Sequence, residues 1–112
     1  MTHNNGQSMS ALAQQYADGT ALNEKRAALR AMAFADGFAV HRRKRGWTLR
    51  EAAEAIGVGH VTLHEVETGR KLPSPDSLYC LCHTYKLNFY DMVCEMGAVR
   101  AGNEARRAGL LR

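Results

Sequence analysis

The stretch that decides the fold is TLREAAEAIGVGHVTLHEVETG, which runs from Thr48 to Gly69. Thr48 and Glu51 have the spacing of a capping box, in which each side chain accepts a hydrogen bond from a backbone N–H group at the start of a helix. Gly57 can adopt the positive φ that ends such a helix. A second short helix is expected to follow, and Gly69 ends it. The stretch therefore predicts two short helices joined by a tight glycine turn.

The residues around this turn resemble the lambda-repressor-like helix-turn-helix family, also called the Xre/Cro type. The resemblance covers about residues 34–93 and rests on an ordered set of positions: Arg42, Thr48, Ala53, Gly57, Val58, Thr62, Leu63, Glu67, Gly69 and Pro73. Two positions depart from the family pattern. Leu49 stands where a polar phosphate contact is common, and Gly59 replaces the usual Ser or Thr cap of the second helix. The resemblance implies an all-α, five-helix domain that binds double-stranded DNA.

The length and composition of the chain indicate one domain with a modest core. The chain has 112 residues and three cysteines. An odd number of cysteines fits reduced thiols better than a complete disulfide framework. No apolar run is long enough to cross a bilayer, and the first ten residues lack the apolar stretch of a signal peptide. We therefore expect a cytoplasmic protein with no membrane attachment.

Positive charge is gathered in two parts of the chain, which has a net charge of +4. Residues 38–72 hold seven basic and four acidic side chains. Residues 98–112 hold four basic side chains and one acidic side chain. Charge gathered around the motif and at the C-terminal end suits a polyanionic partner such as DNA.

Capping signals suggest where the remaining helices lie. We expect disorder over residues 1–9, a short helix from Ser10 to Gly19, and a longer helix from Thr20 that either reaches Arg45 or breaks near residues 36–37. Ser74-Pro75 and Asn88 are expected to start two later helices. Gly97 is expected to end the last helix.

These elements predict three parts of the chain. A partly disordered, partly helical N-terminal extension covers residues 1–32, the helix-turn-helix domain covers residues 33–97, and a basic, mobile tail covers residues 98–112. The extension is expected to serve assembly, because Leu22, Leu29 and Met32 form an apolar stripe among alanines. The alternatives are that the stripe folds back onto its own domain or contacts a partner such as a toxin.

The second helix of the motif is the predicted reader of DNA bases. In the family, the N-terminal part of this helix enters the major groove. By position, the exposed reading residues are His60, Val61, His64 and Glu65. Imidazoles can donate to a guanine edge, a valine methyl can touch a thymine methyl, and a carboxylate can accept from a cytosine amino group. Leu63 and Val66 should instead point into the core. The alternative for each reader is an ordinary surface residue.

Other polar residues are predicted to contact phosphates. Thr62 and Thr68 resemble phosphate-contacting positions of the family, although Thr62 could instead bond back into its own helix. The candidate clamps on the DNA backbone are the basic residues Arg43, Lys44, Arg50, Arg70 and Lys71. The alternative for each of these side chains is a solvated charge.

Arg42 and Glu67 are predicted to have a structural role. The resemblance suggests a partly buried ion pair between them, which ties the helix before the motif to the end of the reading helix. A metal site is not expected, because Cys80 and Cys82 would point to nearly opposite sides of a helix. No paired ligands meet others at zinc-finger spacing, and no catalytic group or cofactor site is recognisable.

Together these features predict a sequence-specific DNA-binding transcriptional regulator that is not an enzyme. We expect a repressor that acts as a homodimer on a palindromic operator. Two alternatives remain open. One is an antitoxin that masks a toxin and regulates its own operon. The other is a helix-turn-helix used as a protein-interaction module that does not bind DNA.

Overall fold

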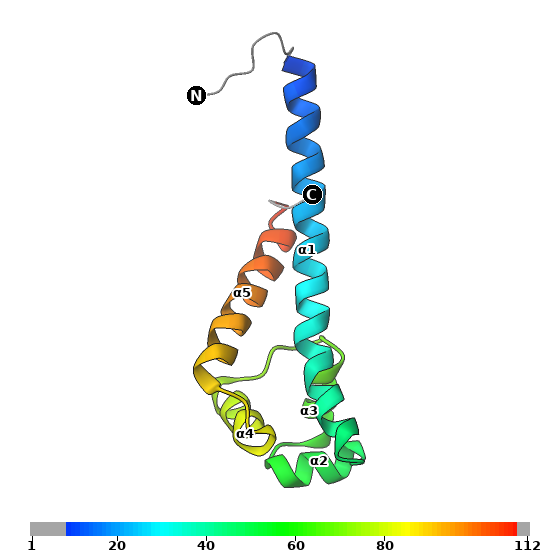
Figure 1. Cartoon of the computed structure of the whole chain (residues 1–112), viewed down its shortest axis with the longest axis vertical. Helices are drawn as coiled ribbons and strands as arrows, with labels where there is room; N and C mark the ends of the chain where they lie inside the picture. The colour runs from blue at the N-terminus through cyan, green and yellow to red at the C-terminus, as the bar shows by residue number, and fades with distance from the viewer. Residues whose placement is uncertain (1–8, 110–112) are drawn as a thin grey trace.

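The computed structural model describes the backbone of residues 9–109 and the side chains of residues 23–109. This part of the chain contains five helices and no strand (Figure 1): α1 Met9–Lys44, α2 Leu49–Ile56, α3 His60–Glu67, α4 Pro75–Tyr85 and α5 Phe89–Arg107. The expected all-α, five-helix helix-turn-helix fold is confirmed. The disorder expected over residues 1–9 lies outside the described residues except at Met9, where it is wrong because α1 begins there.

Helix α1 is one continuous helix, so the predicted interruption at Gly19 and Thr20 is wrong, as is the alternative break near residues 36–37. A glycine costs a helix interior only about 1 kcal/mol relative to alanine. Around Gly37 this cost is outweighed by packing, because Phe34 and Phe38 are 7% and 1% exposed. Their rings meet edge to face with centroids 5.2 Å apart. The predicted extension and the first helix of the domain are therefore one element.

Helix α5 continues past Gly97, where it was predicted to end. Val99, which lies in the segment predicted to be a mobile tail, is only 2% exposed. At Gly102 the helix approaches α1 so closely that an added Cβ would lie 3.2 Å from the Cβ of Ala27. Packing against α1 thus explains why the helix extends further than its sequence suggested. The proposed boundaries at residues 32 and 97 both fall inside helices.

The core holds the two motif helices against α1 and α4. The largest fully buried side chains are Phe38 of α1, Leu63 of α3, and Leu78 and Leu81 of α4. Each such side chain stabilises the fold by about 1.5–3 kcal/mol relative to an exposed position. In Figure 1, α2 and α3 lie at one end of the molecule, while α5 runs back beside α1.

An ion pair fixes the end of α3 to α1. The Nε–H group of Arg42 donates to both carboxylate oxygens of Glu67, at 2.9 and 3.1 Å. The side chains are 17% and 5% exposed, respectively. Arg42 also donates from Nη1 to the carbonyl oxygen of Trp47 at 3.0 Å. The hydrogen bond to Glu67 raises the pKa of Arg42 above its ordinary value, so the guanidinium stays charged.

We expect Glu67→Ala to destabilise the protein, because it leaves the largely buried Arg42 side chain without its carboxylate partner. The expected loss in the free energy of unfolding is about 2–3 kcal/mol, between the values typical of exposed and fully buried pairs. Urea unfolding would measure it. The control is Glu95→Ala, which removes the exposed ion pair with Arg30 and should cost less. Equal losses in the free energy of unfolding of the two variants would show that the Arg42–Glu67 pair stabilises the fold no more than an exposed ion pair does.

Local hydrogen bonds fix both ends of α2, the first helix of the motif. The side chain of Thr48 accepts from the N–H of Glu51 at 3.1 Å, and Glu51 accepts from the N–H of Thr48 at 2.8 Å. The capping box is therefore confirmed. Gly57 ends α2 with φ of 91° and donates its N–H to the carbonyl oxygen of Ala53 at 2.8 Å. Only glycine adopts this left-handed conformation without a steric cost.

A matched pair of glycine variants tests the turn. Gly57→Ala should lower the free energy of unfolding by about 1–2 kcal/mol, the cost of placing a Cβ in the left-handed region. Gly59 has φ of −70°, and an added Cβ would meet only Thr62 Oγ1, at 3.8 Å. Gly59→Ala should therefore lose only the mild preference for glycine at a helix N-cap. Thermal melting of both variants would compare them, and a larger loss from Gly59→Ala contradicts the argument.

Candidate nucleic-acid interface

Helix α3 has one face in the core and the opposite face in solvent. Leu63 and Val66 are 1% and 3% exposed, as predicted. His60, Val61 and His64 are exposed, and Val61 keeps 60% of its accessible surface. These three predicted readers therefore share an accessible surface at and after the N-terminus of the helix. The side chains can reach a ligand without any movement of the core.

Glu65, the fourth predicted reader, lies in a different environment. Its carboxylate is 3.6 Å from the ammonium group of Lys71, and its side chain is 26% exposed. Its backbone carbonyl accepts from the N–H groups of Arg70 and Lys71. The Glu65 side chain thus faces the loop after α3. Its contact with Lys71 joins a predicted base-reading residue to a predicted phosphate clamp. To contact DNA, either side chain would have to give up this weak, largely exposed interaction.

The two predicted threonines differ in whether their hydroxyl groups are free. Thr62 is exposed and makes no hydrogen bond through its side chain within the described part of the chain. Thr68 donates its hydroxyl to the carbonyl oxygens of His64 and Glu65, at 2.8 and 3.3 Å. A phosphate oxygen needs a donor, so Thr62 is ready for such a contact and Thr68 is not. The back-bonding considered for Thr62 occurs at Thr68 instead.

The candidate clamps come from three elements. Arg50 lies in the first turn of α2, Lys44 at the end of α1, and Arg70 in the loop after α3. All three side chains are exposed, and none forms an ion pair with a described carboxylate. Nη2 of Arg43 lies 3.5 Å from Oδ1 of Asp36, but both side chains are more than half exposed. Such a contact is worth little, so Arg43 also remains accessible.

Two other basic residues near the end of α1 contribute to packing. The guanidinium of Arg45 lies over the rings of Tyr85 and Trp47, at 4.9 and 5.8 Å from their centroids. His41 stacks on the Tyr85 ring with centroids 5.4 Å apart. Burial, followed by the nearby charges of Arg45 and Lys44, lowers the pKa of His41 below its ordinary value. His41 therefore adds no positive charge to this surface at neutral pH.

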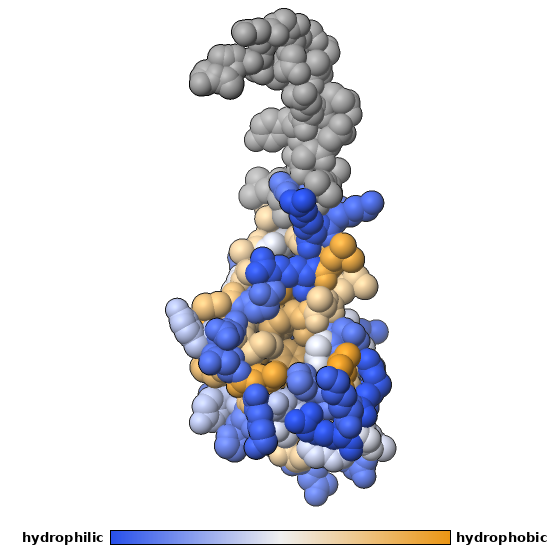
Figure 2. All heavy atoms as spheres, in the orientation of Figure 1, coloured by the Kyte–Doolittle hydropathy of each residue, from blue (hydrophilic) through white to orange (hydrophobic). Residues whose placement is uncertain are grey.

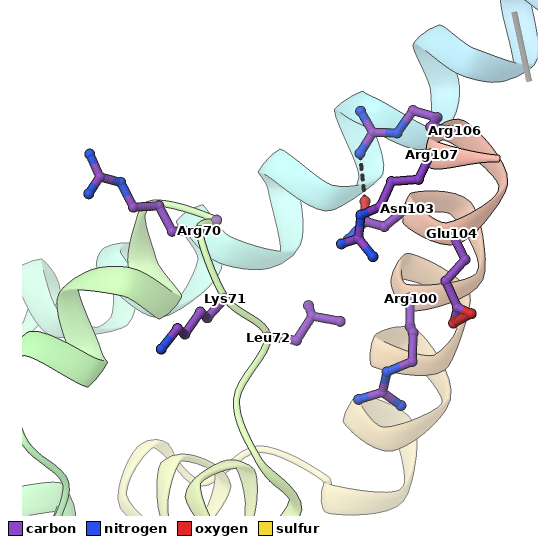
Figure 3. A pocket seen from close by; sticks show the side chains of 9 residues that line it. Arg70, Lys71, Leu72, Arg100, Asn103, Glu104, Arg106 and Arg107 are labelled. Carbon is purple, nitrogen blue, oxygen red and sulfur yellow. Dashed lines mark hydrogen bonds between the residues drawn. The ribbon is translucent and has the colours of Figure 1, made fainter. Parts of the chain in front are cut away.

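The structure also brings basic residues of α5 beside the loop after α3, which the sequence analysis did not anticipate. Arg100, Arg106 and Arg107 line a groove there together with the loop (Figure 3). The net positive charge of residues 98–112 was the available signal. The position of this charge beside the loop after α3 was not predicted, because α5 was expected to end at Gly97.

Other kinds of site were also considered. The described residues contain no group of three or more His, Cys, Asp or Glu side chains that could hold a metal ion. None of the helices described is both long and apolar enough to span a membrane.

Comparisons with known proteins place the fold in a family. A family model described as a helix-turn-helix domain matches residues 33–88, which is half of the chain. Two solved structures of the clp gene regulator ClgR from Corynebacterium glutamicum are similar to the chain. One is 34% identical, covers 61% of this chain and 88% of its own, and has a TM-score of 0.48.

The second ClgR structure is 32% identical, covers 70% of this chain and 84% of its own, and has a TM-score of 0.49. A comparison with curated protein sequences gives no match. The assignment to the Xre/Cro type stays a prediction. Because the family model matches half of its length, the chain belongs to the helix-turn-helix domain family.

Proposed function

We propose that this chain is a sequence-specific DNA-binding transcriptional regulator of the cytoplasm. One observation carries the proposal: α3 buries Leu63 and Val66 while it exposes His60, Val61 and His64. A helix that packs on the core along one face and is exposed at its N-terminal half suits insertion into the major groove, as in other helix-turn-helix domains. Unpaired cations on the neighbouring elements supply attraction to the phosphate backbone.

The contacts of the proposed complex divide into two kinds. His60, Val61 and His64 would meet base edges, where imidazoles can donate to guanine and a valine can touch a thymine methyl. Thr62 and Arg50 would meet phosphates, which fix the register of the protein without reading sequence. Glu65 is a weaker candidate for a base contact, because it must first leave Lys71.

We further propose a homodimer that represses by occupying a palindromic operator. Leu29 and Met32 on α1 are 63% and 66% exposed. They line a largely apolar groove of about 670 Å³ between α1 and the end of α3. Figure 2 shows one face of the molecule, on which apolar side chains gather in the middle part, where Figure 1 places α1 and α5 side by side. For a dimer formed by this surface, we expect an operator with half-sites about one DNA turn, roughly 34 Å, apart.

Salt dependence of binding tests the DNA-binding proposal against a protein-interaction module. We expect the logarithm of the association constant for duplex DNA to fall with the logarithm of salt concentration, with a slope of about −4 to −7. This is the value for four to eight phosphate contacts at about −0.9 each. Fluorescence anisotropy would measure the slope. A response that stays flat between low and moderate salt would speak against the proposal.

Variants of reading and clamping residues should behave differently. His60→Ala and Val61→Ala should change which bases are preferred, because each lost base contact costs about 1–3 kcal/mol of discrimination. Arg50→Ala should weaken all sites almost equally and reduce the salt slope by about 1. Selection of sites from a random DNA pool, followed by binding to single-base variants, would measure both effects. An unchanged preference in both reader variants would mean that this face does not read bases.

Paired charge insertions locate the proposed dimer interface. Deleting residues 1–32 would remove Arg30 and Ala31, which contact α5 and the core, so substitutions are cleaner. Leu29→Glu with Met32→Glu should convert the dimer into a folded monomer, because carboxylates are costly to bury in an apolar contact.

The matched control places the same charges at the start of α5. Tyr90 and Val93 are 68% and 40% exposed, and we take them as a second candidate interface. Tyr90→Glu with Val93→Glu should leave the dimer intact in sedimentation experiments. A monomer from this control alone would move the interface to α5.

A further inference from the structure

A basic groove lies between the loop after α3 and the last turns of α5. It has a volume of about 740 Å³. Five of its nine lining residues are Arg or Lys, and one is Glu: Arg70 and Lys71 come from the loop, and Arg100, Arg106 and Arg107 come from α5. The groove is separate from the exposed face of α3, because none of its lining residues belongs to that helix.

The charge inside the groove comes from α5. Arg100, Asn103 and Arg107 are three and seven residues apart, so they share one face of the helix. Figure 3 shows their side chains extending from α5 toward the loop and Leu72. Lys71 and Arg70 project from the loop away from α5 in the same view. Leu72 adds an apolar wall opposite the arginines.

The positive charges of the arginines on α5 are not neutralised by carboxylates in the described part of the chain. Among the described side chains, no carboxylate forms an ion pair with Arg100 or Arg107, even though Glu104 lines the same groove. Asn103 Oδ1 accepts a hydrogen bond from Nη2 of Arg106. Nε of Arg106 is buried and has no acceptor among the residues that the structure describes. Cations held together with unused donors create a local potential that attracts anions.

We infer that this groove binds a phosphate-bearing anion, held by Arg100 and Arg107. The planar guanidinium group matches phosphate oxygens with two parallel donors. Asn103 can add its amide NH₂ group, since its oxygen already accepts from Arg106. Two arginines separated by two turns of helix favour a ligand with linked phosphates. That chemistry is shared by a free polyphosphate-bearing molecule and by the DNA backbone beyond the reach of α3.

The first arm of the test uses inorganic tripolyphosphate and does not rest on the proposed function. Isothermal titration calorimetry should show binding to the full chain, weakened at least about tenfold in Arg100→Gln/Arg107→Gln, because two charge-assisted hydrogen-bonding groups are lost. The control Lys25→Gln/Lys86→Gln removes two exposed cations that do not line the groove. The affinity of this control variant for tripolyphosphate should equal that of the parent protein. Circular dichroism melting checks that both variants fold.

The second arm uses a random-sequence DNA duplex long enough for two half-sites. If the groove holds the backbone, Arg100→Gln/Arg107→Gln should make the salt slope shallower by about 2, one contact for each arginine. The control variant should keep the parent slope.

A selective loss in either arm supports the inference and identifies the source of the phosphate. Losses in neither arm, or equal losses in the control, overturn it. A parent protein that binds tripolyphosphate but no duplex would overturn the proposed function while it keeps the groove.

Discussion

The position of α3 depends on the ion pair between Arg42 and Glu67. Leu63 and Val66 hold the middle of α3 on the core, and the turn at Gly57 connects its N-terminal end to α2. The hydrogen bonds from Arg42 to both oxygens of Glu67 fix the C-terminal end of α3 against α1. The same guanidinium also binds the carbonyl of Trp47, just before α2. One largely buried cation therefore connects α1 to the start of α2 and to the end of α3.

Local signals in the sequence predicted the helix starts well. Thr48, Ser74 and Asn88 each cap a helix with a side-chain oxygen that accepts from a nearby backbone N–H. Such bonds need only residues three positions apart, so the sequence contains all the information. The ends at Gly19 and Gly97 failed because the cost of a glycine is small, and packing between distant segments can exceed it. The contact of α5 with α1 near Gly102 is of that kind and has no local signature.

The candidate site shows the same division. The inward direction of Leu63 and Val66 and the exposure of His60 and Val61 followed from the positions of these residues in the family pattern that the motif resembles. The contact of Glu65 with Lys71 could not be foreseen, because it depends on the path of the loop after α3. The groove beside α5 likewise depends on two segments about 30 positions apart.

The two basic parts of the chain, residues 38–72 and 98–112, differ in how many of their charges have partners within the fold. The number of basic residues does not show this difference. At the end of α1, Arg42 is neutralised by Glu67, and Arg45 lies on aromatic rings. Much of that charge stabilises the fold, and the attraction left for DNA comes from fewer groups than the sequence suggests. On α5, Arg100 and Arg107 have no such partners within the described residues. A guanidinium that stabilises nothing within its own chain keeps its full capacity for an external anion. Arg100 and Arg107 share this property with Lys44, Arg50 and Arg70, which likewise form no ion pair with a described carboxylate.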